Sequence, residues 1–189
     1  MAARTRKRKS AAKSTARKSK SSKKPAAKKV APIPRGYHSL TPYLTCRDAI
    51  GAIAFYKKAL GAKEKSRMLG PDGKVMHAEI QIGESMLMLG EENMQMNTPS
   101  PQQLGGSASG VFVYAPNVDK LYASAIAAGA TAEMPPADMF WGDRYCKFVD
   151  PYGHKWSIGT HIEDVTPKEM ERRGREFMAQ QAAQAAPKP

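Results

Sequence analysis

The sequence is poor in cysteine and has no long apolar run, and each absence limits what the protein can be. Its 189 residues include two cysteines, Cys46 and Cys146, which are far apart and outside any CxxC motif. Neither a disulfide framework nor a thiolate metal site is therefore predicted. No stretch of 18 apolar residues occurs, and no apolar signal-peptide core follows the basic start, which argues against membrane spanning and secretion. We expect a cytoplasmic protein with reduced thiols and one domain with a real core.

Acidic residues are missing from the first 47 positions, so the excess positive charge of the chain lies near its N-terminus. The formal net charge is +13. Residues 30–189 hold 17 basic and 17 acidic residues and are therefore neutral. The excess lies in residues 1–29, whose basic residues are Arg4, Arg6, Lys7, Arg8, Lys9, Lys13, Arg17, Lys18, Lys20, Lys23, Lys24, Lys28 and Lys29.

Residues 1–36 are predicted to form a disordered tail rich in Lys, Arg, Ala and Ser. Residues 1–29 contain no aromatic residue and, after Met1, no aliphatic residue larger than alanine, so burial cannot offset the entropy of ordering. The composition resembles the tails of histones and histone-like bacterial proteins. This implies non-specific, salt-sensitive binding to DNA or RNA phosphates and a nucleoid-associated location. Two alternatives stay open: a solubilising tail, and an organellar transit peptide, which the lack of Leu and Phe disfavours.

The rest of the chain shows one order of predicted elements twice. In unit one, residues 39–90, a strand precedes a helix that begins after Asp48 and ends at Gly61, and three strands follow. After a polar linker, residues 91–108, unit two over residues 109–162 again reads as a strand, a helix and three strands. The repeat predicts an α+β fold of two tandem βαβββ units.

Residues 166–189 are predicted to hold a C-terminal helix and a short tail. Thr166, Pro167 and Glu169 form a capping-box arrangement, which favours a real helix start. The apolar face of this helix is thin and consists of Met170, Phe177 and Met178. We expect it to pack on a partner or on the edge of the domain.

Two phrases carry a resemblance to a known family. "RDAIGAIAFYKKALGA" in unit one and "DPYGHKWSIGTHIEDV" at the end of unit two resemble the vicinal oxygen chelate superfamily. This superfamily includes glyoxalase I, extradiol dioxygenases and bleomycin resistance proteins, and the resemblance is to its PhnB-like branch. It covers residues 37–165 and implies a glyoxalase-like domain: a partly open, cup-shaped barrel, a homodimer, and a small-molecule ligand on the concave face.

The resemblance also identifies positions where a metal would be bound. In metal-dependent members the first and fourth strands of each unit supply His and Glu ligands, and these slots fall on Thr41, Met88, Gly110 and Ser157. None of the four is an acid or an imidazole, so we expect no metal and no other cofactor. His154 and His161 cannot replace them, because residues seven apart on a strand point to opposite faces.

Strand alternation selects a polar pair as the first candidate site. His77 and Glu79 share one strand face with Gln81, while Ala78 and Ile80 share the other, which should face the helix. The pair is either a proton-transfer or ligand-binding pair, and so a weak catalytic candidate, or two polar residues on a wet sheet face.

Bulky residues make up the rest of the predicted ligand site. Tyr43, Met88, Phe112 and Tyr114 should share the concave face with Ser157, because Val111 and Val113 take the helix side. Trp141, Arg144 and Tyr145 lie in or after a loop at the rim, where they could close over a planar or anionic ligand.

The function predicted from these residues is metal-independent binding of a small molecule of unknown identity, in the manner of glyoxalase and bleomycin resistance proteins. Two alternatives remain: a metal-dependent lyase, isomerase or dioxygenase of the same superfamily, and a nucleic-acid-associated protein tethered by its basic tail.

Overall fold

The computed structural model describes residues 30–185. The predictions of a disordered tail and of nucleic-acid contacts rest on residues 1–29 and lie outside the described residues, as does the end of the predicted C-terminal tail, residues 186–189. Among the described helices, none combines the length and apolar character that a membrane crossing requires.

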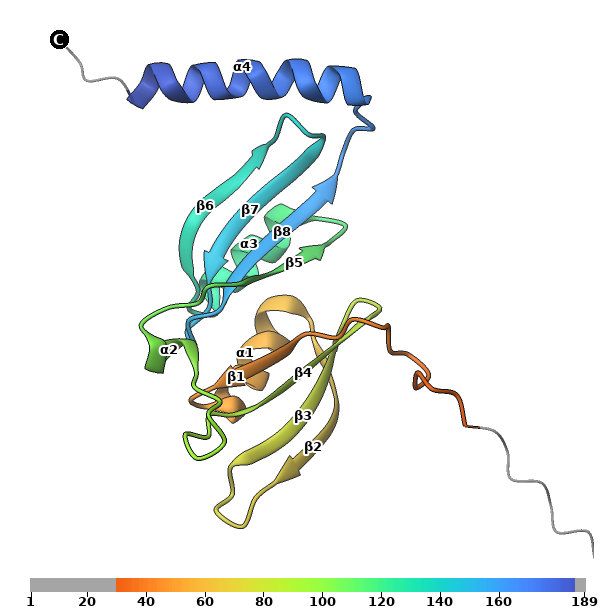
Figure 1. Cartoon of the computed structure of the whole chain (residues 1–189), viewed down its shortest axis with the longest axis vertical. Helices are drawn as coiled ribbons and strands as arrows, with labels where there is room; N and C mark the ends of the chain where they lie inside the picture. The colour runs from red at the N-terminus through yellow and green to blue at the C-terminus, as the bar shows by residue number, and fades with distance from the viewer. Residues whose placement is uncertain (1–29, 186–189) are drawn as a thin grey trace, which may run out of the picture. The chain divides into compact units, whose positions relative to one another are not determined.

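Unit one folds as one helix against a four-stranded sheet (Figure 1). The strand order is β1-β4-β3-β2, with β1 parallel to β4 and the other pairs antiparallel. The elements are β1 (Tyr43–Cys46), α1 (Ala49–Leu60), β2 (Lys63–Leu69), β3 (Val75–Ile82) and β4 (Ser85–Glu91).

Unit two repeats this arrangement with the order β5-β8-β7-β6 and β5 parallel to β8. Its elements are β5 (Gly110–Tyr114), α3 (Val118–Ala127), β6 (Thr131–Asp138), β7 (Asp143–Val149) and β8 (Lys155–His161), and the linker before it contains the short helix α2 (Pro101–Leu104). The predicted α+β fold with two tandem βαβββ units is confirmed. The two sheets are separate and do not close into a barrel, which is consistent with a cup.

Helix α1 begins and ends where the sequence predicts. The Asp48 side chain accepts a hydrogen bond from Gly51 N at 2.9 Å, and Gly61 adopts the left-handed conformation with φ 65°. Asn117 caps α3 by accepting from Lys120 N at 2.8 Å. Local side-chain chemistry therefore sets these boundaries.

One apolar core runs through both units. It lies between the sheets and their helices, and α1 and α3 also contact each other. Alternation behaves as expected on β3, where Ala78 and Ile80 are fully buried on the helix side. The largest fully buried side chains are Trp156, Tyr56, Phe148, Ile53, Ile80, Leu89 and Ile158. The opposite face of each sheet is left for function.

The buried carboxylate of Asp150 joins the two units. Its Oδ2 accepts hydrogen bonds from the Tyr56 hydroxyl of α1 at 2.7 Å and from Trp156 Nε1 at 2.9 Å. Its Oδ1 accepts from the backbone N–H groups of Tyr152 and His154, both at 2.9 Å. Asp150 thus shapes its own turn and ties that turn to the first helix.

The histidine just before β8 and the histidine at its end, His154 and His161, lie in different surroundings. His154 is buried, with Nε2 at 3.6 Å from Cys46 Sγ, whereas His161 lies at the end of β8 between two carboxylates. Burial lowers the pKa of His154 and raises the pKa of the Cys46 thiol. His154 and Cys46 therefore belong to the core that joins the units.

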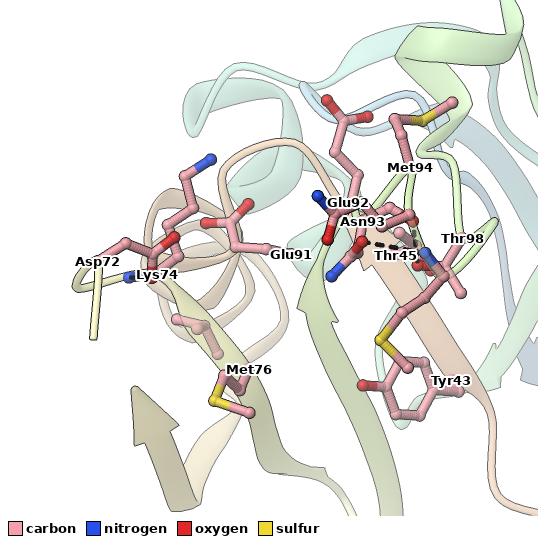
Figure 2. Close-up of a pocket in the computed structure, with 13 residues that line it drawn as sticks. Tyr43, Thr45, Asp72, Lys74, Met76, Glu91, Glu92, Asn93, Met94 and Thr98 are labelled. Atoms are coloured by element: carbon pink, nitrogen blue, oxygen red, sulfur yellow. Dashed lines mark hydrogen bonds between the residues drawn. The ribbon is translucent and has the colours of Figure 1, made fainter. Parts of the chain in front are cut away.

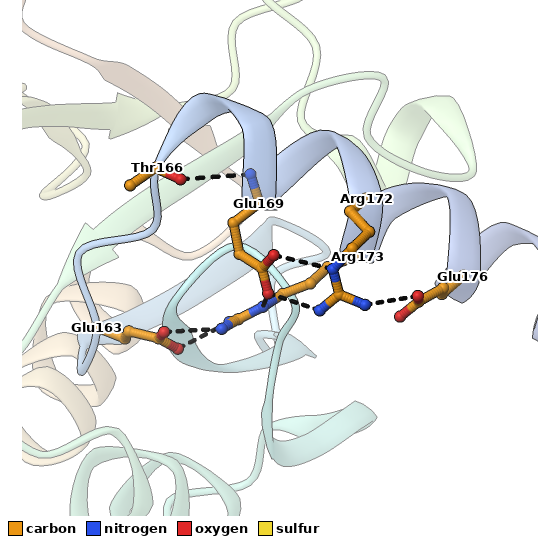
Figure 3. Close-up of polar contacts among 6 residues, drawn as sticks. All are labelled: Glu163, Thr166, Glu169, Arg172, Arg173 and Glu176. Carbon is orange, nitrogen blue, oxygen red and sulfur yellow. Dashed lines mark hydrogen bonds and ion pairs between the residues drawn. The ribbon is translucent and has the colours of Figure 1, made fainter.

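Helix α4 (Pro167–Ala185) packs on the edge of unit two through a charged cluster (Figure 3). Thr166 Oγ1 accepts from Glu169 N at 3.3 Å, as the capping box predicts. Arg173 donates to Glu163 at 2.8 Å and to Glu169 at 2.7 Å. The ring of Phe177 also lies 5.3 Å from that of Phe140, in the turn between β6 and β7.

The hydrogen bonds of Asp150 lead to a prediction about stability. Replacing Tyr56 with Phe removes one donor from a buried carboxylate and should lower the free energy of unfolding by about 1.5–3 kcal/mol. Urea unfolding with an unchanged m-value measures the loss. Tyr122→Phe is the matched control, because the Tyr122 hydroxyl forms no hydrogen bond with the residues that the structure describes. Equal midpoints for the two variants would contradict the role of Asp150.

Candidate functional site

Four aromatic side chains form a continuous patch on the open side of sheet two, which we call the aromatic face: Phe112, Tyr114, Trp141 and Tyr145. The Phe112 ring centroid lies 4.9 Å from that of Tyr114 and 5.8 Å from that of Tyr145, and Trp141 lies 5.5 Å from Tyr145. Phe112 and Tyr114 are 47% and 65% exposed. Large rings held together at a surface are unusual unless something covers them.

A glycine and a hydroxyl pair lie beside these rings. A Cβ on Gly159 would come within 3.0 Å of Phe112 and 3.3 Å of Tyr114, so glycine lets both rings approach β8. The Tyr145 hydroxyl and Ser157 Oγ are hydrogen-bonded at 2.8 Å. The aromatic face therefore offers flat apolar surface beside two hydroxyl groups that can donate or accept.

Asp143 anchors the outer part of the aromatic face and was missed by the sequence analysis. It is buried, and its Oδ2 accepts from the Tyr114 hydroxyl and from Trp141 Nε1, both at 3.1 Å. The bond with Asp143 raises the pKa of Tyr114. The sequence held one indication of such an anchor: the Tyr114 hydroxyl and the Trp141 N–H need a hydrogen-bond acceptor when they are partly buried.

His161 completes the surroundings of Asp143. Its Nδ1 lies 2.8 Å from Asp143 Oδ1, and its Nε2 lies 3.0 Å from Asp164 Oδ1. With a carboxylate on each ring nitrogen, the protonated imidazole is favoured. Asp164 and then Asp143 therefore raise the pKa of His161.

The predicted polar pair lies on the open side of sheet one. His77 Nε2 is 3.4 Å from Glu79 Oε1, and the Tyr43 ring centroid lies 5.9 Å from the His77 ring. Glu79 also accepts from Ser66 Oγ at 2.8 Å. Its hydrogen bond with Tyr37 raises the pKa of that tyrosine to about 12 and, with Ser66, lowers the pKa of Glu79. Glu79 is thus held as a charged acceptor.

The structure divides the predicted ligand residues between the two sheets. Met88 pairs with Tyr43 across β1 and β4, whereas Ser157 pairs with Phe112 across β5 and β8. A cavity of about 600 Å³ reaches Phe112 and Tyr114, and unit one lines it with residues 82–87, Leu40, Pro42 and Leu60 rather than with His77 or Glu79. The two groups therefore do not meet in this cavity.

Arg144 lies on the other side of sheet two from the aromatic face, contrary to the sequence prediction. It donates to Asp119 of α3 at 2.7 and 2.8 Å and to Asp138 at 2.8 Å. On β7 it alternates with Tyr145 and shares the helix side with Cys146, which is buried. We therefore leave Arg144 out of the candidate site.

The positions matching the family's metal ligands do not fit a divalent ion. Thr41 precedes β1 and donates to His38 O at 3.3 Å, and Ser157 is bonded to Tyr145. Met88 and Gly110 offer no oxygen or nitrogen side-chain ligand. Within residues 30–185, moreover, no group of three or more His, Cys, Asp or Glu side chains comes together to hold a metal.

Comparison with known proteins places the chain in a family. The profile described as the Glyoxalase/Bleomycin resistance protein/Dioxygenase superfamily matches residues 37–158, and the chain belongs to this superfamily. An uncharacterized protein of Mycobacterium bovis is 38% identical over 136 residues, covering 70% of this chain and 90% of the relative.

Two solved structures show the same fold at lower identity. TioX from Micromonospora sp. ML1 has a TM-score of 0.52 and 24% identity, covering 65% of this chain and 98% of TioX. The PhnB protein of Bacillus cereus has a TM-score of 0.51 and 17% identity, covering 65% and 99%. The predicted superfamily is thus confirmed by the profile match, and the likeness to PhnB is a likeness of fold.

The His161 contacts predict a pH-dependent contribution to stability. Because the folded-state pKa is raised above the ordinary value of 6.5, the contribution is full below pH 6.5 and is lost as the pH rises through the raised value. We expect the wild type to melt above His161→Gln at pH 5 and the difference to shrink by pH 9.

This experiment compares the two proteins at each pH because His154, whose pKa is lowered, changes the stability of both in the opposite direction. Thermal unfolding at five pH values measures the difference. A gap that is the same at pH 5 and pH 9 would show that the imidazolium form is not favoured.

Proposed function

We propose that this protein binds a small molecule on the aromatic face of sheet two and does so without a metal. The observation that carries the proposal is the contiguity of the four rings, two of which are fixed by the buried Asp143 carboxylate. Rings held in place before binding lose little conformational freedom when a ligand covers them.

The chemistry of the face favours a planar ligand with a hydrogen-bonding edge. Phe112 and Tyr145 are near-parallel, with 23° between their planes, and Trp141 meets Tyr145 edge-on at 73°. A flat ring can stack on such a surface, and the hydroxyl groups of Tyr145 and Ser157 can bond to a polar group at its edge.

A metal-dependent lyase, isomerase or dioxygenase has less support. The His77 and Glu79 pair could transfer a proton, since the two side chains are 3.4 Å apart. However, Glu79 is occupied by Ser66, and the positions that match the family's ligands carry none of its His or Glu side chains. Ligand binding without catalysis therefore agrees better with the residues of the site.

The aromatic face makes a prediction about affinity. Equilibrium dialysis against planar aromatic compounds should find a ligand whose affinity falls about ten-fold or more in Phe112→Ala, because a stacked ring is lost. Arg144→Gln is the matched control on the opposite side of the sheet and should bind normally. A ligand equally sensitive to both variants would contradict this site.

Tryptophan fluorescence gives an independent measurement of the same site. The chain has two tryptophans, and Trp156 is fully buried, so a ligand-dependent change should come from Trp141. The change should disappear in Trp141→Phe.

The basic N-terminal segment supports a second, compatible function. Residues 1–29 carry 13 basic residues and no acid, which suits a non-specific contact with nucleic-acid phosphates.

The prediction for this segment concerns salt dependence. Fluorescence anisotropy with a short DNA duplex should show affinity that falls steeply with salt, with a log–log slope of about −0.9 for each phosphate contacted. Replacing the 13 basic residues with Gln preserves the length of the segment and should abolish this binding. Binding that persists in the Gln variant would assign it to the rest of the chain.

A further inference from the structure

A second cavity, of about 450 Å³, lies at the end of sheet one (Figure 2). It is bounded by β1, by the turn between β2 and β3, and by residues 91–98 at and after the end of β4. None of the four residues of the aromatic face lines it. Any ligand here would therefore be recognised by different chemistry.

One wall of this cavity is apolar and unusually rich in methionine. Met76, Met94 and Met96 line it with the ring of Tyr43, and all four side chains are more than half exposed. Thioethers are flexible and polarizable, so they adapt to apolar ligands of varied shape. The Tyr43 ring beside them can contact a cation through its face. An exposed wall of this kind is suited to the apolar part of a ligand.

The other wall carries three carboxylates and one ammonium group: Asp72, Glu91, Glu92 and Lys74. Two of the carboxylates already have partners. Glu92 accepts from Arg47 at 3.0 Å and from Ser100 Oγ at 2.6 Å, and Asp72 accepts from Lys74 N at 3.1 Å. The third carboxylate, Glu91, differs from these two because one of its oxygens is buried without a donor among the described residues.

Glu91 is held in place by one oxygen and left without a partner at the other. Its Oε1 accepts from Ala49 N at 3.1 Å, at the start of α1. Its Oε2 is closed to solvent and has no hydrogen-bond partner within the described part of the chain. Burial raises the pKa of this carboxyl. A buried acceptor is costly unless a donor reaches it, and an N–H group bearing a positive charge is the strongest such donor.

We propose that this cavity binds an amphipathic organic cation, with a primary ammonium group at Glu91 and an apolar chain against Tyr43 and the three methionines. In the structure Oε2 is closed to solvent, so the carboxylate must turn about its soft terminal torsion to present an oxygen to the cavity. Both oxygens turn together, and the bond from Ala49 N then lengthens or passes to the other oxygen as the ammonium binds. With three acids against one base, the wall attracts a cation and disfavours an anion.

Three probes of equal chain length test the charge requirement on the full chain: n-hexylammonium, n-hexanol and hexanoate. Titration followed by the methyl NMR signals of Met76, Met94 and Met96 reports both affinity and location. The ammonium should bind about ten-fold or more tightly than the alcohol, as expected for one charge-assisted hydrogen bond, and hexanoate should not bind. If the alcohol binds as well as the ammonium, the proposal is wrong.

Three variants then locate the interaction. Glu91→Gln should weaken hexylammonium binding about ten-fold or more, whereas Glu133→Gln, an acid of sheet two paired with Lys147, should not change it. Lys74→Gln removes the competing cation and should strengthen binding about two- to five-fold, a gain that misfolding cannot produce. Unchanged affinity in Glu91→Gln would overturn the assignment.

Discussion

The buried carboxylate of Asp150 is the interaction on which the arrangement of the two units depends. Each of its oxygens accepts two hydrogen bonds, one pair from its own turn and one pair from Tyr56 and Trp156. A carboxyl group is tolerated in a core only when its oxygens are hydrogen-bonded in this way. Because the donors come from both units, the same four bonds that shape the turn also fix α1 against unit two.

This junction directs the helix-covered sides of both sheets into the common core. The opposite sides are left open, and the two carry different kinds of side chain. Sheet two presents aromatic rings that Asp143 holds in place, whereas sheet one presents a charged and polar side with His77 and Glu79 and, at its end, a methionine-rich cavity with Glu91. The aromatic face and this cavity are lined by different residues and can therefore change independently.

Much of the fold follows from local patterns. The cap of α1 at Asp48 and the alternation on β3 and β5 depend on residues within a few positions, so the sequence predicts them correctly. Arg144 could also have been placed correctly, because it alternates with Tyr145 and shares the side of the buried Cys146. Its charge and its position near a loop suggested a ligand contact, but its guanidinium donates instead to Asp138, six residues away, and to Asp119 of α3, which is distant in sequence.

The sequence by itself determined the two βαβββ units, the family and the residues that occupy the family's metal positions. Tertiary structure decided which of those residues meet. Asp143 became an anchor because Tyr114 of β5 reaches it in addition to the nearby Trp141. Among residues 30–185, Ala49 N alone donates to Glu91, so the second oxygen of Glu91 lacks a partner there. Periodicity and capping are local properties, whereas the partner of a buried polar atom depends on how distant strands pack.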